Sequence, residues 1–81
     1  METRVAVISI VVEEPESVGK LNDLLHQYSG YIIGRMGIPH KAKNISIISV
    51  AIDAPQDVIN TLTGGIGKLD GITAKAAYSK A

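Results

Sequence analysis

One order of features occurs twice along the chain, and this repetition restricts the folds open to it. An aliphatic run over residues 4–12 is followed by Glu13-Glu14-Pro15, and another over residues 45–52 is followed by Asp53-Ala54-Pro55. β-Branched aliphatic residues favour strands. A proline among acidic residues favours a helix start, where its missing N–H needs no partner and negative charge suits the helix dipole. Each half therefore predicts a strand followed by a helix.

Apolar residues at helical spacing follow both prolines. The first helix is predicted from Pro15 to Tyr28, with Gly30 as a left-handed cap beyond its end. The second is predicted from Pro55 to Leu69, although each glycine within it weakens the helix by about 1 kcal/mol relative to alanine. The predicted strands cover residues 4–12, 31–38, 45–52 and 72–78, and the polar turn 39–44 joins the middle two as a hairpin.

These elements follow the order βαββαβ, and a chain of 81 residues is long enough for one domain. Right-handed crossovers place both helices on the same face of a four-stranded antiparallel sheet. The sequence therefore predicts an α+β fold of ferredoxin-like architecture, with residues 1–81 forming a single domain. The first and third strands are central in the usual strand order of this fold.

The side chains of a strand alternate between the two faces of a sheet, so strand positions divide by parity. Even positions carry more bulk and are assigned to the face beneath the helices: Ile8, Ile10, Val12, Ile32, Met36, Ile38, Ile48, Val50, Ile52, Ile72 and Tyr78. Odd positions, which include Arg35, Thr73 and Lys75, form the other face. The centre of that face is aliphatic, and an exposed apolar patch indicates an interaction surface. We expect a homo-oligomer, a dimer or larger, with these interface residues: Val5, Val7, Val11, Ile45 and Ile47.

Composition excludes several functions. The absence of cysteine excludes disulfides, iron–sulfur ligation and thiol catalysis. Because the formal net charge is zero and the chain has no Phe or Trp, we expect no direct nucleic-acid binding by this chain alone. No apolar run approaches the roughly 20 residues that span a bilayer, and the first residues show no secretory signal pattern. The expected location is the cytoplasm, without membrane contact.

The sequence contains no recognisable catalytic motif. His26 and His40 are the only histidines, and their spacing matches no local metal-binding motif. Arg35, His40, Lys41 and Lys43 make the hairpin basic, which suits either an anion contact or a solvated turn. We expect a protein that is not an enzyme and that has no cofactor and no metal site.

Three segments carry a family resemblance: Gly34-Arg35-Met36-Gly37-Ile38-Pro39, Ile47-Ile48-Ser49-Val50 and Leu62-Thr63-Gly64-Gly65-Ile66-Gly67-Lys68-Leu69. Together with the order of strands and helices, they resemble the family of regulators of the iron-only hydrogenase system, which is similar to ACT-like regulatory domains. The resemblance covers nearly the whole chain. It implies an ACT-like sandwich, oligomerisation and a regulatory role, with transcriptional regulation as one form of that role.

The ACT-like plan implies a ligand site where the first strand meets the first helix, against the second strand of a neighbouring chain. The predicted ligand-binding residues are Glu14, Ser17 and Arg35. Amino-acid-binding ACT domains commonly carry a glycine in the turn after the first strand; here the first glycine is Gly19, which disfavours an amino acid as the effector.

The predicted function is therefore a regulator or sensor that binds a small ligand or a partner protein between subunits. One alternative is a structural accessory subunit that assembles without a ligand. Another is a metal sensor that uses His26 and His40.

Overall fold

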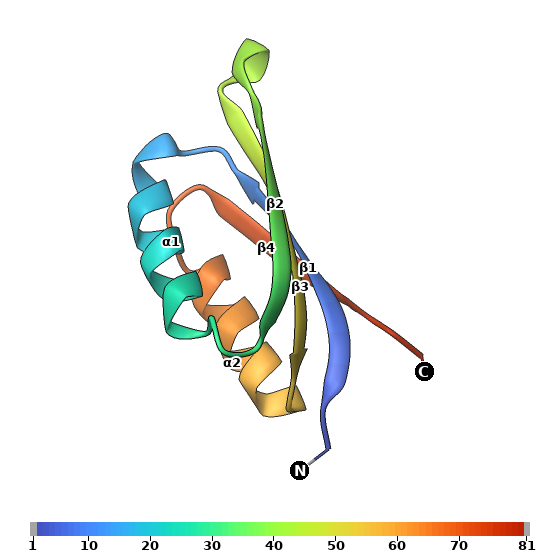
Figure 1. The fold of residues 1–81 in the computed structure, drawn as a ribbon. Coiled ribbons are helices and arrows are strands. Elements are labelled where there is room, and N and C mark those ends of the chain that lie inside the picture. Colours follow the sequence, from blue (N-terminus) through green and yellow to red (C-terminus); the bar gives the residue numbers. More distant parts are fainter. Residues whose placement is uncertain (1, 81) are drawn as a thin grey trace.

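The computed structural model describes residues 2–80 and contains the predicted elements in the predicted order (Figure 1). The strands are β1 (Arg4–Val12), β2 (Ile32–His40), β3 (Ile45–Ala54) and β4 (Ile72–Tyr78). The helices are α1 (Val18–Gln27) and α2 (Gln56–Gly67). Two short 3-10 turns are η1 (Pro15–Ser17), which precedes α1, and η2 (Lys41–Lys43), which connects β2 to β3.

β1 and β3 are the central strands, as predicted, because the strand order is β2-β3-β1-β4. Every neighbouring pair of strands is antiparallel. Both helices lie on one side of the sheet, and within residues 2–80 no further layer covers the other side (Figure 1). The ferredoxin-like α+β fold is therefore confirmed.

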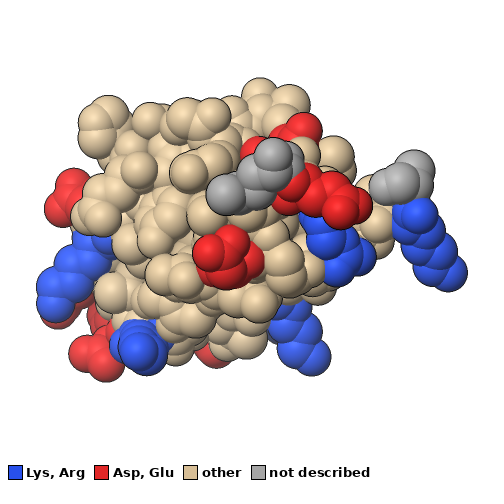
Figure 2. All heavy atoms as spheres, turned by 90° about the horizontal axis from the view of Figure 1, so that it is seen from below, with Lys and Arg blue, Asp and Glu red and all other residues tan. Residues whose placement is uncertain are grey.

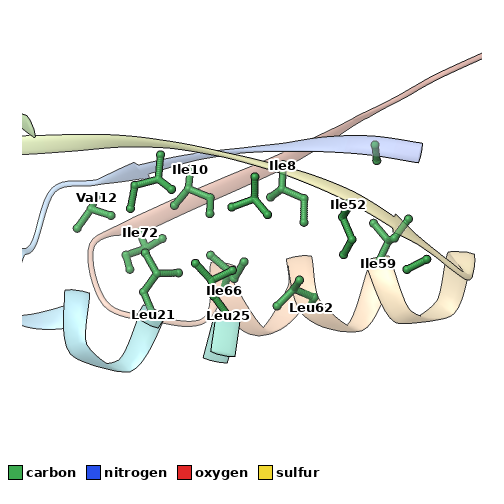
Figure 3. Packing of buried hydrophobic residues seen from close by; sticks show 14 residues of the cluster. Ile8, Ile10, Val12, Leu21, Leu25, Ile52, Ile59, Leu62, Ile66 and Ile72 are labelled. Atoms are coloured by element: carbon green, nitrogen blue, oxygen red, sulfur yellow. The ribbon is translucent and has the colours of Figure 1, made fainter. Parts of the chain in front are cut away.

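The core lies between the sheet and the helices and consists of aliphatic side chains (Figure 3). Ile8 and Ile10 of β1 point toward the helices, and they are fully buried together with Leu21 of α1 and Leu62 of α2. Fully burying one such side chain contributes about 1.5–3 kcal/mol. The even positions of β1 and β3 thus face the helices, as their parity predicts.

β2 departs from the predicted parity because it contains a β-bulge. Ile32 pairs with Ile52, but Gly34 pairs with Ala51, so Ile33 is an extra residue between them. One extra residue reverses the face of every side chain that follows it in the strand.

The assignment of Met36 and Ile38 to the helix-covered face, and of Arg35 to the opposite face, was therefore wrong. Met36 and Ile38 pair with outward-facing positions of β3 and are 62% and 54% exposed. Arg35 pairs with Val50, whose side chain is buried beneath the helices. Because of the bulge, the uncovered face carries the two large apolar side chains of Met36 and Ile38, and the arginine lies on the other face.

The β2–β3 hairpin is longer than predicted and extends beyond the helical layer (Figure 1). β2 continues through Pro39 to His40, which an edge strand tolerates because the missing N–H need not enter the ladder. Asn44 then turns the chain into β3 in a left-handed conformation, with φ of 54°. The left-handed cap predicted at Gly30 was wrong. Among the described glycines, Gly71 is the one with a positive φ, which is 69°.

The glycine-containing segment of α2 stays helical as far as Gly67. A Cβ at Gly65 would lie 3.3 Å from Cδ2 of Leu24 in α1. This glycine therefore allows the two helices to approach closely, which offsets part of its low helix propensity.

Two adjacent lysine substitutions test the faces of β1. Ile8→Lys should unfold the domain, because a buried unpaired charge costs several kcal/mol against a total stability of about 4–12 kcal/mol for a chain of this length. Val7→Lys should leave the domain folded, because Val7 is 40% exposed on the uncovered face. Circular dichroism with urea denaturation measures both. Unfolding by Val7→Lys alone would show that the two faces are reversed.

Candidate functional site

A groove runs between α1 and the β2 side of the sheet. It consists of three adjoining hollows of about 240, 180 and 130 Å³. Asn22 and Arg35 line both the first and the second hollow. Val18, Pro39 and Ser46 line both the second and the third. We call this continuous depression the α1–β2 groove.

Arg35 lies in the middle of the α1–β2 groove, since it lines the two larger hollows there. Its Nη2 donates a hydrogen bond to Oδ1 of Asn22 at 3.0 Å. A guanidinium carries five N–H donors, so this bond orients the side chain and leaves further donors for a ligand. The bulge at Ile33 is the reason that Arg35 faces this groove.

The side chains that line the α1–β2 groove are basic or neutral. Arg35, His26, His40 and Lys41 contribute to it, and no Asp or Glu lines any of its three hollows. This composition favours an anionic group, because a guanidinium binds carboxylate or phosphate through two parallel hydrogen bonds. At the end of the molecule seen in Figure 2, by contrast, acidic and basic side chains are interspersed.

Glu14 and Ser17 lie in the segment between β1 and α1, which contacts the segment between α2 and β4. Neither residue lines the groove. Ser17 is buried, and its Oγ donates a hydrogen bond to the Asp70 carbonyl oxygen at 2.7 Å. The backbone N–H of Glu13 donates to the Gly71 carbonyl oxygen, also at 2.7 Å. A Cβ at Gly71 would lie 2.5 Å from the Cβ of Glu14, so only glycine fits there. Ligand contact by Glu14 and Ser17 stays a prediction.

His26 and His40 lie at opposite ends of the α1–β2 groove. His26 lines a hollow together with Ile32, the first residue of β2, whereas His40 is the last residue of that strand. A strand of this length spans roughly 26 Å at about 3.3 Å per residue. The two histidines of one chain are therefore too far apart to share a metal ion. Across residues 2–80, no three His, Cys, Asp or Glu side chains form a group that could hold a metal.

Most residues of the groove wall were not predicted from the sequence, although the sequence contains one signal for them. Asn22, His26 and Ser29 line the same hollow, and their spacing of i, i+4 and i+7 places them on one side of α1 and its following turn. This polar stripe runs beside the buried Leu21 and Leu25. The sequence gives no local indication that β2 supplies the arginine opposite this stripe.

A second polar cluster lies where β1, β4 and α2 meet. The Arg4 guanidinium lies 4.2 Å from the ring centroid of Tyr78 and donates a hydrogen bond to Oε1 of Gln56 at 2.6 Å. Gln56 Nε2 donates to the Tyr78 hydroxyl, also at 2.6 Å. These groups bind one another, so the cluster fastens the ends of three elements together.

Comparison with known proteins identifies the family. A family model described as "TM1266-like: Iron-only hydrogenase system regulator, putative" matches residues 4–76. The chain belongs to this family. The resemblance inferred from the motifs in β2, β3 and α2 is thereby confirmed.

A solved structure of a similar protein matches nearly the full length of the chain. It is "The structure of uncharacterized protein TM1266 from Thermotoga maritima", which matches this chain with a TM-score of 0.93. The sequences are 31% identical, and the match covers 98% of this chain and 100% of that chain. No curated protein matches the sequence. Among residues 2–80, no helix is long and apolar enough to cross a membrane.

The bridge formed by Ser17 can be tested by its removal. We expect Ser17→Ala to lower the free energy of unfolding by about 1 kcal/mol, because the Asp70 carbonyl loses its partly buried donor. Urea denaturation followed by circular dichroism measures the change. Ser29→Ala, at an exposed serine, is the control and should cost less than about 0.5 kcal/mol. Equal losses in both variants would contradict the bridging role.

Proposed function

We propose that this chain is a non-catalytic regulatory subunit of the iron-only hydrogenase system that acts as a homo-oligomer and responds to a small anionic ligand. Membership of the TM1266-like family supports the regulatory role. One observation supports the ligand: Arg35 is oriented in the α1–β2 groove, whose lining includes no acidic residue. The acidic group of the ligand binds the guanidinium of Arg35.

The apolar part of the groove supports a ligand with an apolar body. Leu25 and Ile32 line the hollow on one side of Arg35, and Val18 and Ile48 line the middle hollow. Small-molecule sites typically combine apolar walls with a few polar groups that fix orientation. The proposed ligand class is therefore a small organic carboxylate or phosphate.

The same groups support binding without catalysis. Arg35 and Asn22 can hold and orient an anion, but a guanidinium and an amide are poor nucleophiles and poor proton acceptors at neutral pH. General acid–base catalysis needs a titratable group positioned at the reacting atoms. His26 lines the same hollow as Arg35, but no Asp or Glu lines that hollow to orient its imidazole, and His40 lies at the other end of the groove.

A structural accessory subunit that binds no ligand is the second candidate. The observation that favours it is the uncovered sheet face, where Val5, Val7, Met36, Ile38 and Ile47 are exposed. Such a subunit needs this face for assembly and has no use for the α1–β2 groove. Neither candidate requires direct contact with nucleic acid, which agrees with the formal net charge of zero.

A thermal-shift screen with small organic carboxylates and phosphates separates the two candidates. A ligand present at ten times its Kd stabilises the native state by about 1.4 kcal/mol, which raises the Tm of a domain of this size by about 6–11 °C. We expect one chemical class to give such a shift and Arg35→Met to abolish it.

The control is Lys68→Met, which removes an exposed positive charge at the end of α2, outside the groove lining. This variant should keep the full shift. If no compound raises the Tm, or if both variants lose the shift equally, the ligand proposal fails and the accessory subunit is favoured.

A further inference from the structure

The uncovered face of the sheet is organised in rows that run across all four strands. The pairing of β2 with β3, β3 with β1 and β1 with β4 aligns their outward residues. We call this surface the open face. Its three central rows are Gly34–Ala51–Val7–Ala77, Met36–Ser49–Ser9–Lys75 and Ile38–Ile47–Val11–Thr73.

These rows differ in height. The row that begins with Ile38 has three large aliphatic side chains in succession and forms a ridge. The row that begins with Gly34 contains nothing larger than valine and forms a trough. A shallow hollow of about 270 Å³ lies over the β2–β3 half of this trough, and its lining residues are Gly34, Arg35, Met36, Ser49 and Ala51.

We propose that the open face binds a second copy of this chain through a twofold axis that lies between the sheets, along the Ser9–Ser49 row and perpendicular to the strands. This inference rests on the homo-oligomer in the proposed function and specifies its interface. Such an axis places each strand over its own copy in the opposite direction. Ile38 and Ile47 of one copy then enter the trough of the other, over Gly34 and Ala51.

The other twofold axis that would bring the open faces together runs parallel to the strands, and it fits the rows poorly. It would place β1 over β3 of the second copy and keep each row over itself. The ridge residues Ile47 and Val11 would then meet Val11 and Ile47 of the second copy, while the troughs would face each other and stay unfilled. Protein interiors and stable interfaces are closely packed, so the arrangement that fills the trough is favoured.

The polar groups around the open face are compatible with this orientation. Asp53 lies beside Val5 at one end of the open face, and His40 lies beside Ile45 at the other. The perpendicular axis places Asp53 of one copy over the end of the sheet that carries His40 in the other. Lys75 is the charged residue of the central rows and lies opposite its own copy. Because it lies on the edge strand β4, the amine of each copy can reach solvent.

The size of the open face sets the expected affinity. A sheet of four strands with about eight residues each covers roughly 19 by 26 Å, or about 500 Å² on each copy. The total of about 1,000 Å² is at the lower limit for a specific interface. We therefore expect a dimer that forms in the micromolar range.

Single-cysteine variants test the axis directly, because the full sequence contains no cysteine. In the proposed dimer, Met36 and Lys75 each lie opposite their own copies. Met36→Cys and Lys75→Cys should each form crosslinked dimers with a short bismaleimide. Arg35→Cys is the matched control, since Arg35 is the neighbouring residue, is exposed and faces α1. We expect at least about tenfold more crosslinked dimer for Met36→Cys than for this control, because apposed thiols have a high effective concentration.

Two results would overturn the proposal. One is preferential crosslinking between Met36→Cys and Lys75→Cys chains of different mass, because the parallel axis brings those two positions together. The other is a wild-type chain that light scattering shows to be monomeric at 100 micromolar, about a hundred times the lower end of the expected range.

Ala51→Leu provides a second test, since a filled trough should weaken dimerisation at least about tenfold while circular dichroism stays unchanged. These outcomes concern assembly alone, whereas the thermal shift with Arg35→Met concerns the ligand, so each proposal can fail separately.

Discussion

The burial of β1 beneath both helices is the interaction on which the rest of this structure depends. β1 is a central strand, and its even-numbered side chains meet α1 and α2 in one aliphatic core. Because one face of β1 is buried in this core, a shift of one residue would expose it, and this fixes the register of β3 and β4 against β1. It also leaves the odd-numbered aliphatic side chains of the same strand, such as Val5 and Val7, without cover from the helices.

The bulge at Ile33 then gives β2 two different roles. Arg35 faces α1, and its neighbour Met36 faces the opposite side of the sheet. The groove proposed to bind an anion and the face proposed to bind a second copy therefore use consecutive residues of one edge strand. Except for the half-buried Ile32, every residue of β2 is exposed, so these side chains serve surfaces more than the core.

Other polar groups of the chain maintain the architecture. Ser17 bridges to the carbonyl of Asp70, and Arg4 packs on Tyr78 beside Gln56. Both clusters connect segments that are distant in the sequence but adjacent in the fold. Ser17 is buried, and Arg4 is held between the Gln56 side chain and the ring of Tyr78, whereas Arg35 lines two hollows of the groove. This difference in surroundings distinguishes the proposed binding group from the structural ones.

The sequence alone determined the order of the elements, the two faces of β1 and β3, and membership of the TM1266-like family. Those features are local: they depend on alternation, helical spacing, acidic residues beside proline, and motifs read along the chain. Only the tertiary structure decided the faces of β2. Its apolar residues Ile32, Ile33, Met36 and Ile38 occur at both parities, so no alternation fixed their phase, and the extra residue is defined by pairing with β3. The position of Arg35 in the groove and the ridge on the open face follow from that pairing, because a bulge is a property of two strands together.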